Sequence, residues 1–321
     1  MSDTSLRTSF LLSLYLEGWA YGFLLCLYAC TLYIKFNVKI LGYRDTQTMV
    51  MFVISTVMFF IATFHVIMNM YRLLRAFSDN CGRIRGPELY LGRLNRWDHV
   101  LKDTLYATQE ILGNAAAVYR TWILWGKSWK IIAFPTVMLI AKAIAGYMTC
   151  SIFAHVDPTH NVFDPHLNGW IKTFWSLSVA LNIITTALMA YRIWSTHRLS
   201  LTYSSGKIGR AKSRLLPIIW VLVESAALQL IAELILLGLY CNNSEAQYVV
   251  LELITPIVGI TFNAITIRLK LYAIEEEVHP IHSLDDLTCP RSSTVLSVPL
   301  QDLRQNEDMD VERKTVRHSQ L

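Results

Sequence analysis

Charged side chains inside long apolar segments are the residues of this sequence that could do chemistry. By depth in the spans predicted below, the outer third holds Glu17, Asp103, Glu233 and Glu252, and the middle holds Glu110 and Lys142. An ionised side chain at the centre of a membrane costs about 2.5 to 3.5 kcal/mol on insertion scales, so each one needs a partner or water. We therefore expect these side chains to face the interior of a helical bundle.

One buried ion pair is predicted from spacing and depth. Asp103, Glu110 and Asn114 fall on one narrow helical stripe, because roughly 100° per residue places them at 0°, about 700° and about 1,100°. Lys142 lies at a similar depth on the following span. We hypothesise that Lys142 pairs with Glu110, since either charge alone would be strongly disfavoured there.

The outer carboxylates suggest the chemistry of a ligand. If Glu17, Asp103 and Glu252 line a vestibule open to the outside, their field would attract a cationic or amine-bearing small molecule. The alternative is that these acids are protonated or hydrogen-bonded between helices and serve assembly only. The candidate ligand-binding residues are Glu17, Asp103, Glu110, Asn114, Lys142 and Glu252.

The elements that position these side chains are predicted from hydropathy. The 321 residues are 53% hydrophobic and 17% charged, with a mean hydropathy of +0.36, which is too apolar for an ordinary soluble domain. Apolar segments of about 20 residues or more can cross a hydrocarbon core roughly 30 Å thick. Such segments lie at 10–34, 48–73, 100–125, 131–153, 169–194, 215–240 and 248–271. Lys102, Asp103 and Glu110 interrupt the third, and without it there would be six spans.

The spans predict an all-α fold, a polytopic membrane helical bundle of seven transmembrane helices over residues 10–271. Loops one, three and five carry ten Lys and Arg residues and loops four and six carry none, which places the first set in the cytoplasm. Loop two carries five Arg residues, but it is the longest connection and constrains orientation less. Residues 1–9 would then be a short extracellular arm, and 272–321 a disordered acidic cytoplasmic tail. We expect an integral, multi-pass protein of the plasma membrane rather than an endomembrane, surrounded by the lipid bilayer, with no nucleic-acid partner.

Similar tetrapeptides end the third and fifth spans, Tyr-Arg-Thr-Trp at 119–122 and Tyr-Arg-Ile-Trp at 191–194. Aromatic rings and a snorkelling cation suit the inner membrane interface, and we favour that anchoring role. An ionic latch like that of signalling receptors is the alternative.

Signatures of common catalytic sites are absent from the sequence: there is no GxSxG elbow, P-loop, HExxH motif or pair of histidine boxes. The fourth loop could in principle bind zinc, but no rigid element fixes the geometry of its His155, Asp157, His160, Asp164 and His166. We expect no enzyme, no catalytic residue, no metal site and no cofactor.

Several short stretches carry a family resemblance. They include Trp97, Leu105-Tyr106, Gln109, Leu112-Gly113-Asn114 and Tyr119 to Trp122, and then residues 190–194, 223–227 and 256–260. In these stretches the chain resembles a large basidiomycete (fungal) family of seven-span integral membrane proteins of unknown function. The resemblance implies the topology and a fungal origin, and it supplies no ligand or catalytic residue. The chain differs from rhodopsin-like receptors, because no acid precedes Arg120 and the seventh span has no NPxxY pattern.

A receptor-like sensor is the favoured function, with an extracellular small ligand and a cytoplasmic partner bound through the tail. The alternatives are a small-solute or lipid transporter and a structural or scaffolding membrane protein. A water-filled path joining both faces would favour transport, and a pocket closed on the inside would favour sensing. A bundle packed without any cavity would favour scaffolding.

Overall fold

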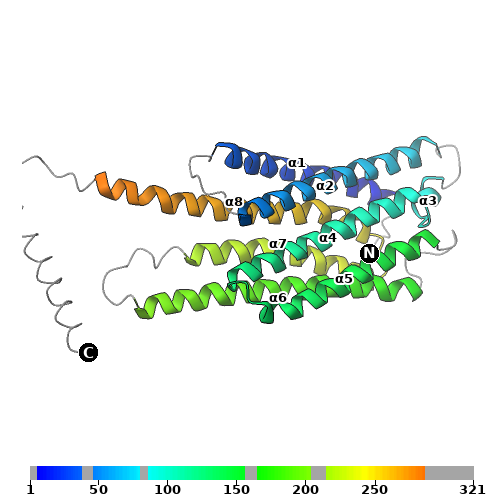
Figure 1. The fold of residues 1–321 in the computed structure, drawn as a ribbon. Helices are drawn as coiled ribbons and strands as arrows, with labels where there is room; N and C mark the ends of the chain where they lie inside the picture. Colours follow the sequence, from blue (N-terminus) through cyan, green and yellow to red (C-terminus); the bar gives the residue numbers. More distant parts are fainter. Residues whose placement is uncertain (1–5, 38–45, 80–85, 156–164, 204–214, 286–321) are drawn as a thin grey trace, which may run out of the picture. The chain divides into compact units, whose positions relative to one another are not determined.

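The computed structural model describes residues 6–37, 46–79, 86–155, 165–203 and 215–285. Within these ranges the chain is helical and has no strand. The helices are α1 (Leu6–Asn37), α2 (Thr46–Ser78), α3 (Gly86–Leu91), α4 (Trp97–Leu124), α5 (Trp129–His155), α6 (Pro165–Tyr203), α7 (Leu215–Cys241) and α8 (Gln247–Asp285). The residues up to Ala273 form one compact unit, in which the long helices run side by side (Figure 1). The predicted all-α membrane bundle is confirmed.

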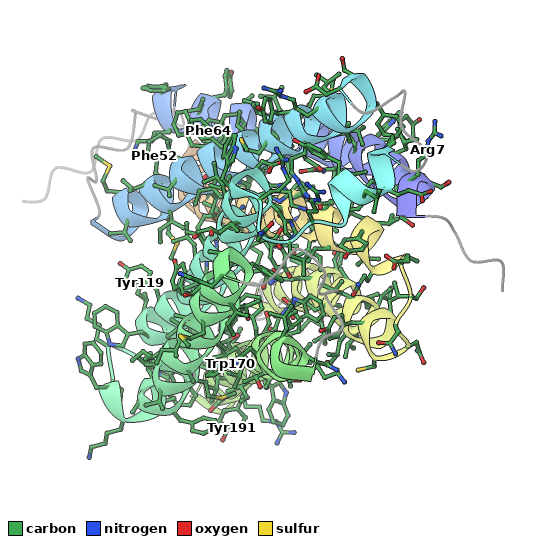
Figure 2. The ribbon with its side chains drawn as sticks, turned by 90° about the vertical axis from the view of Figure 1, so that its right-hand side faces the viewer. Arg7, Phe52, Phe64, Tyr119, Trp170 and Tyr191 are labelled. Atoms are coloured by element: carbon green, nitrogen blue, oxygen red, sulfur yellow. The ribbon has the colours of Figure 1, made fainter. Side chains whose placement is uncertain are left out.

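Six helices are long and apolar enough to cross a membrane: α1, α2, α5, α6, α7 and the part of α8 between Gln247 and Arg268. In lipid each backbone N–H and C=O must pair within its own segment, and an α-helix does this. Large apolar side chains accordingly face outward. Trp19 is 61% exposed and Ile231 is 56% exposed, and the rings of Phe64 and Tyr191 lie at the margins of the bundle (Figure 2).

Helix α4 is the long helix that falls outside this group of six. It packs against α2, α5 and α6, so its polar side chains are covered by protein. Its buried residues include Asp98, His99, Lys102, Gln109, Glu110, Asn114 and Thr121. The central position of α4 in the bundle therefore explains how a helix of low hydropathy can be accommodated there.

Helices α4 and α8 run parallel and close together. Gln109 Nε2 donates to the Thr255 carbonyl, and a Cβ added at Gly113 would lie 2.5 Å from Val258 Cγ1. Glycine at position 113 lets the two backbones approach. Further along both helices, Arg120 Nη2 donates to the Thr266 hydroxyl.

The ends of the bundle extend beyond the predicted limits. Helix α1 begins at Leu6, inside the predicted arm 1–9, and Ser9 is buried at 2% exposure. Helix α8 continues past residue 271 to Asp285, with its last turns in a second unit that begins at Ile274. Residues 286–321 of the predicted tail lie outside the described residues, as do Asp157, His160 and Asp164 of the fourth loop. Of the other two possible zinc ligands in that loop, His155 ends α5, with its Nδ1 2.8 Å from the Ser151 carbonyl, and His166 lies in the first turn of α6.

Candidate functional site

The carboxylate of Glu17 is buried and bound by two side chains of α2. His65 Nδ1 lies 2.6 Å from Glu17 Oε1, and Asn69 Nδ2 donates to Glu17 Oε2 at 2.6 Å. Glu17 is 0% exposed and His65 is 1% exposed. An acid from α1 is thus satisfied by protein groups and does not face lipid.

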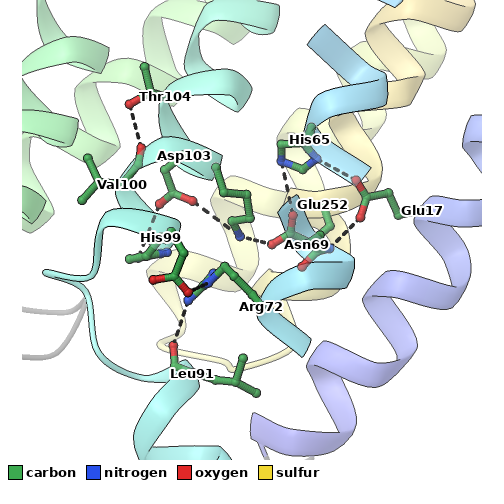
Figure 3. A network of polar contacts seen from close by, with 12 residues as sticks. Glu17, His65, Asn69, Arg72, Leu91, His99, Val100, Asp103, Thr104 and Glu252 are labelled. Carbon is green, nitrogen blue, oxygen red and sulfur yellow. Dashed lines mark hydrogen bonds and ion pairs between the residues drawn. The ribbon is translucent and has the colours of Figure 1, made fainter. Parts of the chain in front are cut away.

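His65 extends this contact to α8 and α4. Its Nε2 lies 3.4 Å from Glu252 Oε2, so the imidazole bridges two carboxylates. Lys102 Nζ donates to the other oxygen of Glu252 and lies 3.5 Å from Asp103 Oδ1. We call the connected set Glu17, His65, Asn69, Lys102, Asp103 and Glu252 the carboxylate network (Figure 3).

The carboxylate network carries more negative than positive charge. It contains three acids, Glu17, Asp103 and Glu252, against one lysine and one histidine. Even with a protonated imidazole, one negative charge is left over. Asp103 is 12% exposed and the other two acids are 0% exposed. Asp103 is the most exposed of the three acids, and its Oδ1 has no hydrogen-bond partner beside the 3.5 Å ion pair with Lys102, so Asp103 lies at the edge of the network.

A pocket opens beside Asp103, between α4, α5, α6 and α8. Its walls are His99, Asp103, Tyr106, Ala107, Gly146, Thr149, Cys150, Phe153, Ile171, Phe174, Trp175, Gln247, Tyr248 and Leu251. The centre of a water molecule fits within about 60 Å³ of this pocket. The whole empty space, including the open mouth, is about 570 Å³. At roughly 10–15 Å³ per water, about four to six water positions fit.

Polar atoms without partners line this pocket. Neither ring nitrogen of His99 has a hydrogen-bond partner, and neither side-chain atom of Gln247 has one. These side chains are 3% and 2% exposed. His99 Nε2 lies 3.6 Å from Asp103 Oδ2, a contact that is too long for a hydrogen bond (Figure 3). The pocket therefore offers a carboxylate, an imidazole and an amide within aromatic walls, groups suited to a small cation with hydrogen-bonding protons.

Two ion pairs form at Asp98, the residue before the pocket-lining His99. Asp98, which precedes the predicted third span, is 0% exposed and lies 3.4 Å from Arg72 Nε and 3.1 Å from Arg96 Nε. Burial alone raises the pKa of the Asp98 carboxyl, but the two guanidiniums outweigh it and hold that pKa below its usual value. Arg72 also donates to the Leu91 carbonyl and so ties α3 to α2.

The predicted pair of Lys142 and Glu110 is confirmed. Lys142 Nζ lies 2.9 Å from Glu110 Oε2, and it also donates to Ser178 Oγ at 2.7 Å. Asn114 Nδ2 donates to the same hydroxyl at 3.2 Å. Lys142 and Glu110 are at most 1% exposed, as a buried pair between adjacent helices requires.

Glu233 belongs to this second group, and its predicted place among the outer carboxylates is wrong. Ser178 Oγ lies 3.0 Å from Glu233 Oε1, and Gln229 Nε2 donates to that oxygen at 2.9 Å. Helix α7 packs against α6, and this packing brings Glu233 to Ser178. The hydropathy of α7 carries no information about which helix it packs against. We call Glu110, Asn114, Lys142, Ser178, Gln229 and Glu233 the middle layer.

The six predicted site residues therefore fall into two groups. Glu17, Asp103 and Glu252 share the carboxylate network, and Glu110, Asn114 and Lys142 share the middle layer. Sequence reasoning missed the groups that complete them: His65, Asn69, Lys102, Ser178 and Gln229. It also missed His99 and Gln247, which line the pocket beside Asp103. One signal was present, because His65 and Asn69 are four residues apart and so lie on one face of a helix.

A metal ion could be considered at the core of the carboxylate network. One ligand atom each from Glu17, His65 and Glu252 lie within 4.8 Å of one another. However, the two ring nitrogens of His65 face different carboxylates, and only one of them could bind the same ion. The contacts fit an imidazole that holds two acids together better than they fit a metal centre.

Comparisons of the chain with protein-family models, with curated proteins and with solved structures give no match in any of the three. The resemblance to a fungal seven-span family therefore stays a prediction, and no ligand or activity is transferred to this chain from a relative.

Proposed function

We propose that this multi-pass membrane protein is a receptor-like sensor that binds a small amine in the pocket beside Asp103. One observation carries the proposal: Asp103 lines an aromatic pocket at the edge of a network with excess negative charge, and its Oδ1 has an ion-pair contact with Lys102 at 3.5 Å but no hydrogen-bond partner. A protonated amine would neutralise that charge and would find acceptors on His99 and Gln247.

The proposal includes α4 as a seventh span. Its contacts with α8 run from Lys102 and Glu252 to Arg120 and Thr266, along most of the α8 segment that can cross the membrane. A helix that follows a spanning neighbour over that length passes through the same layer. The 28 residues of α4 are long enough, at 1.5 Å each, for a core roughly 30 Å thick.

Sensing is favoured over transport by the position of the middle layer. The pocket is lined by α4 residues up to Ala107 and α8 residues up to Leu251, and the middle layer begins at Glu110. Among the described residues, the buried side chains of that layer separate this pocket from a second one near the opposite end of the bundle. A ligand in the first pocket would contact four helices at once and could bias their packing.

Transport of a small solute is the second candidate. The observation that favours it is the second pocket itself, which begins at Gly113 and Gln229 in the middle layer and extends to Arg120. Two pockets on either side of a charged layer would suit alternating access. Two further predictions belong to the sensor proposal: Asp103 lies near the extracellular face of the membrane, and the tail binds a cytoplasmic partner.

Ligand-dependent stabilisation of the full chain in lipid nanodiscs tests the proposal. Isobutylamine has five heavy atoms and is charged at neutral pH, and isobutanol is its uncharged counterpart. We expect saturable stabilisation by the amine, by about 2.7 kcal/mol at 100 times the Kd, and little effect of the alcohol. Asp103→Asn should abolish the response, whereas Glu224→Gln should keep it, because Glu224 is 71% exposed and pairs with Arg268.

Equal responses to amine and alcohol, or an unchanged response in Asp103→Asn, would contradict an amine site. Uptake of labelled isobutylamine into liposomes separates the two candidate functions. Uptake that depends on Asp103 would favour transport, and binding without uptake would favour sensing.

A further inference from the structure

Arg120 is a partly buried cation at the opposite end of α4 from the amine pocket. Its Nη2 donates to the Phe262 carbonyl at 3.1 Å and to the Thr266 hydroxyl at 2.7 Å, and its guanidinium carbon lies 4.1 Å from the centre of the Phe262 ring. These contacts lie between α4 and α8. Arg120 thus joins α4 to α8, a role that the prediction of an anchor in the lipid interface did not include.

The contacts of Arg120 leave its charge uncompensated. All its hydrogen bonds go to neutral oxygens, and it forms no ion pair within the part of the chain that the structure describes. Its Nε is buried and has no hydrogen-bond partner. A buried guanidinium N–H without an acceptor is costly, and a charged donor bonds most strongly to an anion, so this position favours a negative group.

A second pocket lies against Arg120. The centre of a water molecule fits within about 40 Å³ of this pocket. At roughly 10–15 Å³ per water, that is room for about three waters. None of its lining residues is acidic. Asn182 also lines it, is 7% exposed, and has an amide nitrogen with no partner. A guanidinium and an amide donor thus converge on one small space.

We propose that this pocket binds a compact monovalent anion, either chloride or a small carboxylate. The single positive charge of Arg120 matches one negative charge, and the unpaired N–H groups of Arg120 and Asn182 match an acceptor. Gln229 lines the pocket too, but its amide nitrogen already donates a hydrogen bond to Glu233. Glu233 therefore has its hydrogen-bond partners in the middle layer and is not a counter-ion for Arg120. The size of the space excludes a bulky organic anion.

Anion exchange on the full chain in nanodiscs tests this site. Sodium gluconate, chloride, acetate and sulfate are compared at constant ionic strength, with thermal unfolding and titration calorimetry as readouts. We expect saturable stabilisation by chloride or acetate at millimolar concentration, and none by gluconate or sulfate. A larger effect of acetate than of chloride would identify the natural ligand class as a carboxylate, and the reverse order would identify a halide.

Matched variants locate the effect. Arg120→Gln and Asn182→Leu should each weaken the anion at least tenfold, and Arg120→Lys should retain part of the affinity. Arg192→Gln is the control, because Arg192 holds the same position in the similar tetrapeptide of α6 but bonds to the Leu124 carbonyl outside the pocket. If Arg120→Gln fails to fold, Asn182→Leu alone decides.

Stabilisation by all four anions alike, or an anion response that survives in both Arg120→Gln and Asn182→Leu, would overturn the site. The anion site stands apart from the proposed amine site. Asp103→Asn should leave the chloride or acetate response unchanged, so the failure of one proposal is distinguishable from the failure of the other.

Discussion

Lys142 and Glu110 face each other across the α4–α5 contact, with Nζ 2.9 Å from Oε2 and both side chains removed from solvent and lipid. In such a place each charge depends on the other, because neither can be solvated by water. Ser178 adds a neutral hydroxyl within hydrogen-bond distance of both.

Breaking this pair should be costly. We expect Lys142→Met to destabilise the bundle by about 3–5 kcal/mol, because it leaves Glu110 as an uncompensated buried charge. Adding Glu110→Gln should recover a large part of the loss, and the swap of Lys142→Glu with Glu110→Lys should recover some of it. Equilibrium unfolding in mixed micelles measures these differences. The control is Arg268→Gln, whose exposed pair with Glu224 should be worth at most about 1 kcal/mol. Strictly additive losses would show that the two charges do not interact.

The bridging role of His65 predicts a second coupled pair. His65→Leu should destabilise the bundle, because Glu17 and Glu252 would lose the group between them. The further change Glu17→Gln should restore stability, since it removes one of the two facing charges. Tyr21→Phe, which removes a partly buried hydrogen bond to Thr63 on the same two helices, should cost only about 1 kcal/mol.

A chelator tests the metal alternative at the same residues. If His65 bridges two acids without an ion, EDTA should leave the Tm of the purified protein unchanged. A loss of Tm on chelation that zinc reverses would argue for a metal at Glu17, His65 and Glu252.

Close packing of α4 on α8 predicts a steric effect at Gly113. Gly113→Ala places a methyl group 2.5 Å from Val258 Cγ1, so it should destabilise the bundle by about 1–3 kcal/mol. Val258→Ala in the same chain should relieve the clash. Gly238→Ala is the matched control, because nothing lies within 4 Å of its added Cβ, and its helix should gain up to about 1 kcal/mol. A Gly113→Ala protein as stable as Gly238→Ala would contradict the α4–α8 contact.

The Asp98 ion pairs predict a dependence of stability on pH. The folded-state pKa of Asp98 is lowered, so its contribution is present above the unfolded value and is lost as the pH falls through the folded value. Asp98→Asn should therefore be less stable than the wild type at neutral pH, and the gap should narrow as the pH falls below the ordinary value of 3.8. Thermal unfolding over pH 3 to 7 measures the gap.

Asp79→Asn supplies the comparison for Asp98. Asp79 is 48% exposed and pairs with Arg75 within one helix, so its loss should change stability little at any pH. A gap for Asp98→Asn that is constant with pH would mean that its effect is steric and not ionic.

The sequence by itself determined the long apolar helices and which of their charged side chains turn toward the interior. Backbone groups cannot stay unpaired in lipid, so each long apolar segment had to become a helix. Periodicity then set which side chains share a face, which is why Asp103, Glu110 and Asn114 were correctly placed toward the interior. Depth along neighbouring spans was enough to predict the contact of Lys142 with Glu110.

Only the tertiary structure decided which helices meet and what completes each charged group. Periodicity gives the rotation of one helix about its own axis, but it carries no information on which neighbour lies against a given face. Glu233 was therefore assigned to the wrong group, and the links from Glu17 through His65 to Glu252 and from Lys102 to Asp103 were missed. Arg120 shows the same limit: hydropathy indicated the end of a span, and only the packing of α4 on α8 showed that its guanidinium bonds to Phe262 and Thr266 while its Nε stays without an acceptor.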